Sequence, residues 1–191
     1  MNENATEKRE ITLQAAEKLF EANGFHATGV DAIADKAGVT KRTLYKYFGS
    51  KEKLIEAVLR RHQNQMMDRV RTQMSDVKEK GGQRLLACFD LYQKWFSQPH
   101  FAGCIFIKTL NEFQRCSKRL SAIASVAKLE HRNYLVELAE ASGAADPELL
   151  ADQLQLILEG SVVVAQCDRE NASIRVARQL AEQLILQALN C

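Results

Sequence analysis

A short stretch of the chain concentrates side chains that can donate hydrogen bonds to phosphates and to the edges of bases. It spans about two helical turns and contains no acidic residue. The donors are Thr40, Lys41, Arg42, Thr43, Tyr45, Lys46 and Tyr47. Hydroxyl, ammonium and guanidinium groups of this kind contact the DNA backbone and base edges. Packing within a plain helical hairpin does not require so many basic and phenolic groups, so the stretch indicates a nucleic-acid-binding helix.

The residues around this stretch have the spacing of a helix-turn-helix. Ala34 is a small residue where two helices would approach, and Gly38 tolerates the positive φ that the turn requires. The apolar residues expected between the two helices are Ile33, Ala37, Val39 and Leu44. In this motif the second helix lies in the major groove, with its N-terminal residues toward the bases.

The distribution of charge agrees with this interpretation, although the net charge of +2 says little by itself. Residues 1–35 carry three basic and seven acidic side chains. Residues 36–61 carry eight basic and two acidic side chains. The positive charge is therefore concentrated where a polyanion would bind.

Helices are expected throughout, because Pro99 and Pro147 are the only prolines and good helix formers are abundant. Glycines, prolines and capping residues divide the chain into helices at about 4–23, 29–37, 40–48, 51–80, 83–98, 104–115, 117–142, 147–166 and 173–189. We therefore predict an all-α fold, with a domain boundary inside the long helix that begins at Lys51.

Three local signals refine the expected helices. Ile11, Ala15, Leu19 and Ala22 fall at helical spacing and predict the buried stripe of the first helix. Thr28-Gly-Val-Asp31 has the form of a capping box, and Thr40 can cap the following helix. Asp146-Pro147 combines a capping aspartate with proline at the first helical position.

Other classes of protein find little support in the sequence. The apolar runs are shorter than the ~20 residues of a membrane span, and the N-terminus lacks the features of a signal peptide, so we expect a cytoplasmic protein. The five cysteines are widely spaced, which favours reduced thiols over a metal site or a disulfide framework. The sequence lacks a Ser-His-Asp set, a phosphate loop and paired carboxylates, so we expect neither an enzyme, nor a cofactor, nor a metal.

Residues 8–55 resemble the TetR/AcrR family of bacterial regulators. The matching residues are Asn23-Gly24-Phe25, Thr28, Ile33-Ala34, Ala37-Gly38-Val39-Thr40, Thr43-Leu44-Tyr45, Tyr47-Phe48, Ser50-Lys51 and Leu54. The resemblance implies a DNA-binding transcription regulator, expected to be a repressor, that acts on a near-palindromic operator as a homodimer. It also implies a helix-turn-helix domain over 1–54 and a ligand-binding and dimerisation domain over 55–191.

The resemblance also assigns roles to individual residues. It implies DNA contacts from Thr28, Gly29, Thr40, Lys41, Arg42, Thr43, Tyr45, Lys46, Tyr47 and Lys51. Lys51 begins the fourth helix, where the helix dipole already favours an anion. Arg42 departs from the family, in which a small residue is usual, so it either pairs with a guanine or contacts a phosphate.

The second half of the chain is expected to sense a signal. Seven of the thirteen aromatic residues lie between residues 89 and 113, on helices that wall the ligand cavity in the family. The candidate ligand-binding residues are His62, Tyr92, Trp95, Phe96, Cys104, Phe113 and His131. They suit a small hydrophobic ligand, but the same residues could also form ordinary core.

Cys104 supports a different signal. It begins a predicted helix, with Lys108 four residues later, and both features favour the thiolate form. The alternatives are a thiol that senses oxidants or electrophiles and a small buried packing residue. A third function is an architectural DNA binder whose C-terminal half only dimerises.

The last two predicted helices are expected to form the dimer interface. Leu150, Leu154, Ile157 and Leu158 share a face with Ser161 and Val162, and the last helix carries a stripe of Val176, Leu180, Leu184 and Leu189. In the family these helices form a four-helix bundle across the dimer; packing within one subunit is the alternative.

Overall fold

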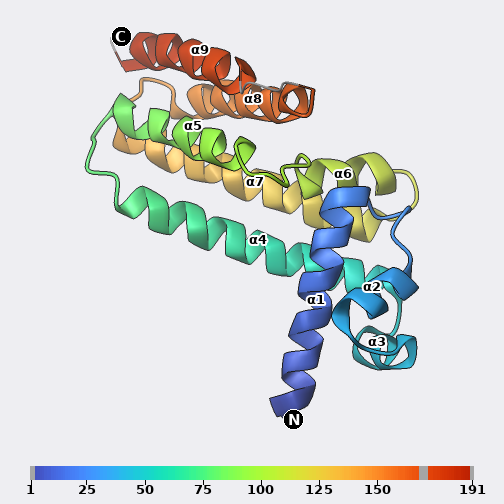
Figure 1. Cartoon of the computed structure of the whole chain (residues 1–191). Coiled ribbons are helices and arrows are strands. Elements are labelled where there is room, and N and C mark those ends of the chain that lie inside the picture. The colour runs from blue at the N-terminus through green and yellow to red at the C-terminus, as the bar shows by residue number, and fades with distance from the viewer. Residues whose placement is uncertain (1–2, 168–171, 190–191) are drawn as a thin grey trace. The chain divides into compact units, whose positions relative to one another are not determined.

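The computed structural model describes residues 3–167 and 172–189, and the regular structure of these residues is entirely helical (Figure 1). The helices are α1 (Glu3–Asn23), α2 (Val30–Ala37), α3 (Lys41–Phe48), α4 (Lys51–Ser75), α5 (Gly82–Phe96), α6 (Ile105–Phe113), α7 (Lys118–Ala141), α8 (Pro147–Ala165) and α9 (Ala172–Leu189). The predicted all-α fold is confirmed. Within the described ranges, no helix has the length and apolarity needed to cross a membrane.

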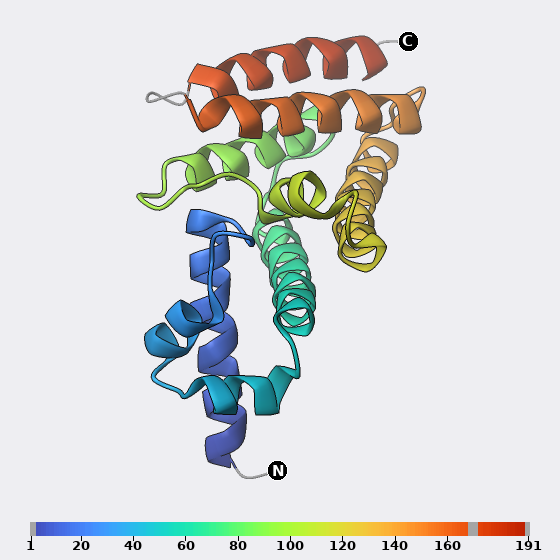
Figure 2. The same ribbon diagram turned by 90° about the vertical axis from the view of Figure 1, so that its right-hand side faces the viewer.

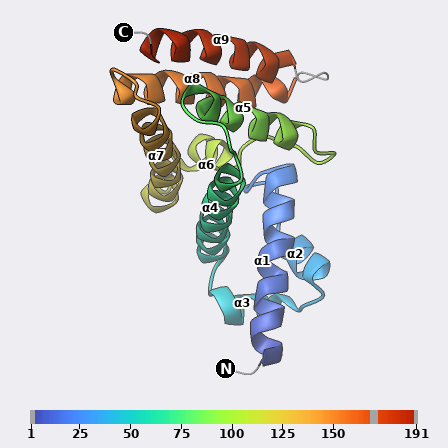
Figure 3. The ribbon, with the colours of Figure 1, turned by 90° about the vertical axis from the view of Figure 1, so that its left-hand side faces the viewer.

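The chain forms two compact units. The first contains the residues up to Gln65 together with Cys104–Ala127, and the second contains Met66–Gly103 together with the residues from Lys128 onward. Both α4 and α7 therefore contribute residues to both units. In the first unit, α1 contacts α2 and α3 (Figure 3).

The helix-turn-helix forms around the residues that the sequence indicated. Gly38 has a φ of 64°, and the next amide, that of Val39, donates a hydrogen bond to the carbonyl of Ala34. Ile33 of α2 and Leu44 of α3 are completely buried, so an apolar contact region lies beneath the turn that joins the two helices. The left-handed conformation of Gly38 and the hydrogen bond from Val39 to Ala34 therefore set the direction in which α3 leaves the turn.

Two predictions about caps have opposite outcomes. The Oγ1 of Thr40 accepts a hydrogen bond from the amide of Thr43 at 3.1 Å, so the predicted cap of α3 is confirmed. The capping box at residues 28–31 is wrong, because Gly29 is the N-cap of α2 and forms no side-chain cap. Thr28 is instead buried, and its hydroxyl donates to the carbonyl of Gly24 at 2.7 Å.

The prediction of which face of α1 is buried is also wrong, by part of a helical turn. Ile11 is 41% exposed and Ala22 is exposed, although Ala15 is buried as expected. The side chains that α1 buries most deeply include Leu13, Ala16 and Phe20, together with Thr12. Burying Leu13 and Phe20 removes more apolar area from water than burying Ile11 and Ala22 would, so the helix is rotated toward them.

Segment 104–127 joins the first unit through the end of α1. The carboxylate of Glu112 accepts hydrogen bonds from the amides of Phe25 (2.9 Å) and His26 (2.7 Å). One turn earlier on α6, the ammonium of Lys108 donates to the carbonyl of Glu21. The ring of Phe113 packs edge-on against that of Phe25. Polar and apolar contacts together thus hold α6 on the turn after α1.

In the second unit, α8 and α9 run antiparallel and side by side, and α5 contacts both (Figure 2). The predicted start of α8 is confirmed, since the Oδ1 of Asp146 accepts from the amide of Leu149 at 3.0 Å and Pro147 opens the helix. A Cβ at Gly82 would lie 2.5 Å from a methyl group of Ile185, so this position admits the close approach of α9. The glycine pair at 81–82 was expected to end α4, but α4 ends at Ser75 and Gly81 caps α5.

The faces of α8 and α9 differ in their burial. Leu150, Leu154, Leu158, Ser161 and Val162 are buried within the chain, so these residues of the predicted dimer face form core instead. Other apolar residues of the two helices are exposed: Leu149, Leu156, Val163, Val164, Val176, Leu180 and Leu186. Two members of the predicted stripe on α9, Val176 and Leu180, therefore lie on the surface, while Leu184 is half-buried.

The Glu112→Ala variant should lower the free energy of unfolding by about 2 kcal/mol, because two backbone donors lose a charged acceptor. Urea denaturation at a fixed protein concentration measures this. Asn111→Ala, an exposed change on the same helix, is the matched control and should stay within about 0.5 kcal/mol of the parent. Equal midpoints for the two variants would show that Glu112 does not stabilise the fold.

Candidate nucleic-acid interface and candidate ligand cluster

One face of α3 presents its polar groups to solvent along the length of the helix. Lys41, Arg42, Tyr45 and Lys46 are exposed, while Leu44 and Phe48 are buried against the rest of the unit. Because buried and exposed side chains alternate with the helical period, one face of α3 is fixed and the other is free to contact DNA. These positions are those that the sequence indicated.

Hydrogen bonds within the chain hold some of these groups. The ammonium of Lys41 on α3 lies 3.0 Å from the carboxylate of Asp31 on α2, and this bond raises the pKa of Lys41. The hydroxyls of Thr40 and Thr43 are 2.8 Å apart. Asp31 was not among the predicted site residues, since its importance depends on the fold of the turn between the two helices.

Arg42 and Lys46 differ from Lys41 in having no acidic partner among the described residues. Within the described residues, neither side chain forms a hydrogen bond or an ion pair. Both are exposed, so their charged groups are free to contact DNA. Tyr45 is 39% exposed, whereas Tyr47 is half-buried and its ring lies edge-on to Phe48.

The beginning of α4 offers a further anion site. The Oγ of Ser50 accepts from the amide of Lys53 at 3.1 Å, which leaves other amides of the first turn without partners inside the helix. Lys51 is half-buried, and burial lowers the pKa of its ammonium, although the charge of Glu112 opposes this shift. A cation and a helix N-terminus thus coincide here.

The beginning of α2 differs from what the sequence suggested. Thr28 was expected to contact a phosphate, but it is 3% exposed and its hydroxyl bonds within the chain. Gly29 is exposed, and a Cβ placed there would meet no other atom. The surface at this point is therefore formed by Gly29 and the backbone of α2, and the side chain of Thr28 has a structural role.

Four of the seven candidate ligand residues lie together in the second unit. The rings of Trp95 and Phe96 on α5 lie 5.7 and 6.0 Å from that of Tyr92, and the Tyr92 hydroxyl is 3.2 Å from the Nε2 of His131 on α7. We call Tyr92, Trp95, Phe96 and His131 the aromatic cluster. Burial lowers the pKa of His131 to about 4, so its ring is neutral at physiological pH. Its Nδ1 is buried and has no hydrogen-bond partner among the described residues.

The other three candidates belong to the first unit. Phe113 packs against Phe25 and His26. Cys104 is buried and caps α6, as its predicted position at a helix start required. The Nδ1 of His62 lies 2.6 Å from the carboxylate of Glu17, and its ring packs edge-on against that of Phe106.

His62 also belongs to a charged group that the sequence did not reveal. Within the described residues, potential metal-ligating atoms of Glu17, Glu21 and His62 lie within 4.8 Å of one another. Arg61 forms ion pairs with Glu17 and with Glu10, so the carboxylate of Glu17 already has partners. The group is therefore explained as an ion-pair network between α1 and α4.

The model of the family described as bacterial regulatory proteins, tetR family, matches residues 13–58. The chain is 26% identical over 93% of its length, and 93% of the relative's, to the HTH-type transcriptional regulator YjdC of Escherichia coli. It is 41% identical over 45% of its length to the HTH-type transcriptional activator FasR of Mycolicibacterium smegmatis, covering 39% of that protein. It is 25% identical over 95% of its length to the HTH-type transcriptional repressor NicS of Pseudomonas putida, covering 86% of that protein.

Solved structures agree on the fold. SCO4454, a TetR-family transcriptional regulator from Streptomyces coelicolor, superposes with a TM-score of 0.90 at 21% identity over 96% of this chain and 97% of that one. The reduced form of NemR from E. coli gives a TM-score of 0.85 at 23% identity over 93% of this chain and 96% of that one. From the family match over residues 13–58, the relatives and the geometry of α2 and α3, the chain carries a helix-turn-helix of the TetR family and is a DNA-binding transcriptional regulator.

Proposed function

We propose that the protein is a repressor that binds a near-palindromic operator as a homodimer and releases it when a small hydrophobic ligand binds. The exposed donor face of α3 is the observation that carries the DNA-binding part of this proposal. The name of NicS, which is similar over nearly the whole chain, supports repression. FasR, named as an activator, matches only 45% of this chain.

The proposed DNA contacts fall into two kinds. Hydroxyls, backbone amides and a helix N-terminus suit contacts with phosphates. The residues that would make these contacts are Gly29, Thr40, Thr43, Tyr45, Tyr47 and Lys51. In the major groove of the DNA, positive charge would come from Lys41, Arg42 and Lys46. Of these, Arg42 is the best candidate for reading a base, because its guanidinium is exposed and has no partner among the described residues.

Arg42→Ala should relax the preference for one base pair in each half-site, at about 1–3 kcal/mol if the guanidinium pairs with guanine. Selection of bound sequences from random DNA measures the preference. Lys51→Ala is the matched comparison: it should weaken all operators alike and reduce the slope of log affinity against log salt by about one per lost contact.

Two outcomes would contradict these assignments. An unchanged sequence motif with uniformly weaker binding would place Arg42 on the phosphate backbone. An unchanged salt slope in the Lys51→Ala variant would remove Lys51 from the phosphate contacts.

The proposed dimer surface is the exposed apolar face of α8 and α9. On α8, Leu156, Gly160 and Val163 follow each other at intervals of four and three residues, and each is exposed. A Cβ at Gly160 would meet nothing, so a partner helix could approach closely there. On α9, Val176 and Leu180 extend the same kind of surface. Exposed apolar residues that lie together favour binding of a protein partner. The homodimer implied by the family resemblance makes a second copy of the chain the proposed partner.

Leu156→Arg should convert the dimer to monomer at micromolar concentration, because it places a charge in the centre of the apolar face. Leu156 is 75% exposed, so the monomer should fold normally. Leu129→Arg, at a 53% exposed leucine of α7, is the matched control and should remain dimeric. Sedimentation equilibrium measures both, and a dimeric Leu156→Arg variant would exclude this face.

The proposed ligand site is the aromatic cluster, where the neutral His131 and the Tyr92 hydroxyl offer polar contacts among apolar rings. The alternative is a thiol switch at Cys104. Its position at the start of α6 and the presence of Lys108 favour that idea, while its burial restricts access by oxidants. Burial raises the pKa of the Cys88 thiol to about 12, which makes that cysteine a poor sensor.

If a hydrophobic ligand is the signal, a lipophilic aromatic probe should quench Trp95 fluorescence and release operator DNA over one concentration range. The Cys104→Ser variant should respond equally. If Cys104 is the switch, mild oxidant should release DNA from the parent but not from this variant. Cys116→Ser and Cys167→Ser are the controls, because both thiols are exposed; Cys191 lies outside the described residues and is changed in parallel. Release by oxidant from a variant without any cysteine would reject the thiol switch.

A further inference from the structure

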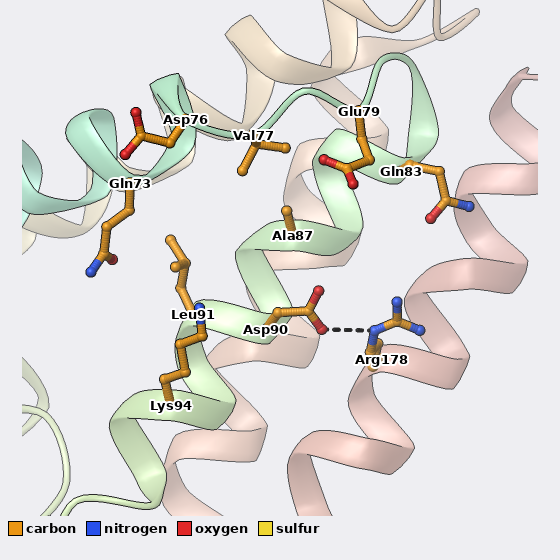
Figure 4. Close-up of a pocket in the computed structure, with 10 residues that line it drawn as sticks. All are labelled: Gln73, Asp76, Val77, Glu79, Gln83, Ala87, Asp90, Leu91, Lys94 and Arg178. Carbon is orange, nitrogen blue, oxygen red and sulfur yellow. Dashed lines mark hydrogen bonds and ion pairs between the residues drawn. The ribbon is translucent and has the colours of Figure 1, made fainter.

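Several arginines of the described residues form ion pairs with carboxylates. Arg178, on the wall of a cavity of about 480 Å³ in the second unit, lies 3.0 Å from Asp90 (Figure 4). In the first unit, Arg61 pairs with Glu10 at 2.8 Å. Arg9 on α1 differs, because it is exposed and forms no hydrogen bond or ion pair with any described residue. Its charge is therefore available to a partner outside the chain.

Arg9 instead contacts an aromatic ring of α3. Its Cζ lies 5.1 Å from the centre of the Phe48 ring, within the range of a cation–π interaction. Phe48 is the last residue of α3 and is buried, and α3 contacts α1 (Figure 3). The guanidinium is thus held at the C-terminal end of the helix whose exposed face carries the candidate DNA contacts, and its N–H donors remain unpaired among the described residues.

The position of Arg9 along α1 explains this placement. Arg9, Leu13, Ala16 and Phe20 follow each other at intervals of four, three and four residues, so they share one face of the helix. The last three are buried, and Arg9 continues their face toward the N-terminus. Its stem therefore lies along the edge of the core, while its charged group stays in contact with water.

The acidic side chains close to Arg9 in sequence leave this face positive. Glu10 is bound by Arg61, which also pairs with Glu17. Glu7 is exposed, but it lies two residues from Arg9 and so about 200° away around the helix. At the end of α3, α1 therefore presents a cation that can attract a polyanion.

We propose that Arg9 is a further DNA-contacting residue, whose guanidinium binds a backbone phosphate of the operator at the end of α3. In the chain, Phe48 lies between Tyr47 and Lys51, and its ring is in edge-on contact with that of Tyr47. The inference rests on the proposed function, in which Tyr47 and Lys51 contact phosphates. Guanidinium groups bind phosphates through charge-assisted hydrogen bonds. DNA would then be held by α1 as well as by α3 and α4.

The alternative is a purely structural role, in which Arg9 only covers the ring of Phe48. A long unbranched apolar side chain would also cover the ring, so Arg9→Met keeps this packing and removes the charge. Lys18→Met is the matched control, because it removes the same charge from the same helix. Lys18 is exposed and lies nine residues after Arg9, about half a turn away around α1.

The test is fluorescence anisotropy of the full chain with a labelled duplex that the parent protein selects from random DNA, measured over a range of salt concentrations. Arg9→Met should bind about tenfold more weakly, because it loses a charged hydrogen bond. The slope of log affinity against log salt should fall by about one for each lost contact. Lys18→Met should bind like the parent. Thermal melting should show that both variants fold, since both positions are exposed.

Duplexes that carry one uncharged methylphosphonate at a time locate the contact. One substitution should weaken binding by the parent protein and leave binding by Arg9→Met unchanged, because that variant no longer uses the charge of the phosphate.

A parent-like salt slope in Arg9→Met would overturn the proposal, and with a lower melting temperature it would assign Arg9 the structural role. Equal losses in Arg9→Met and Lys18→Met would also overturn it, because the effect would then come from net charge alone. Failure of the proposed function looks different: the parent protein itself would then select no sequence from random DNA.

Discussion

The first unit depends on one carboxylate. A turn such as that at residues 24–26 leaves backbone amides without intrahelical acceptors, and Glu112 supplies an acceptor for two of them. The fit is close, since a Cβ at Gly24, where φ is 82°, would lie 2.7 Å from an oxygen of Glu112. Glycine is thus required both for the backbone conformation and for the approach of α6. As a result, the unit that carries the DNA-binding helices includes a segment far along the chain, and its integrity depends on residues outside the helix-turn-helix.

Features that depend on a few neighbouring residues could be predicted from the sequence. The turn at Gly38, the cap at Thr40 and the start of α8 at Asp146-Pro147 each follow from the conformational preferences of the residues involved. Thr28 shows where this reasoning fails. Its position and type suit a capping box, but tertiary packing buries it and its hydroxyl finds an acceptor at the end of α1. Glu112 could not be identified at all, because its partners precede it by 87 and 86 residues.

The same distinction applies to the candidate sites. Exposure along α3 was predictable because one short amphipathic helix determines it. The density of aromatic residues over 89–113 did not indicate which of them would meet. Tyr92, Trp95 and Phe96 lie on neighbouring turns of α5 and form the cluster, whereas Phe113 lies on α6 and packs on the end of α1. Two residues close in sequence can thus serve different units, and only the packing of the helices decides which.

The hydrogen bonds of α3 also order its polar groups by their freedom to act on DNA. The hydroxyls of Thr40 and Thr43 pair with each other and help to hold the start of the helix, so they are oriented before DNA arrives. Lys41 must leave Asp31 to contact DNA, but exposed ion pairs are weak and the exchange of one anion for another costs little. Arg42 and Lys46 have no such bond to break among the described residues. Because a bidentate contact with a base requires a guanidinium free to rotate into place, this order leads to Arg42 as the side chain best suited to distinguish one operator from another.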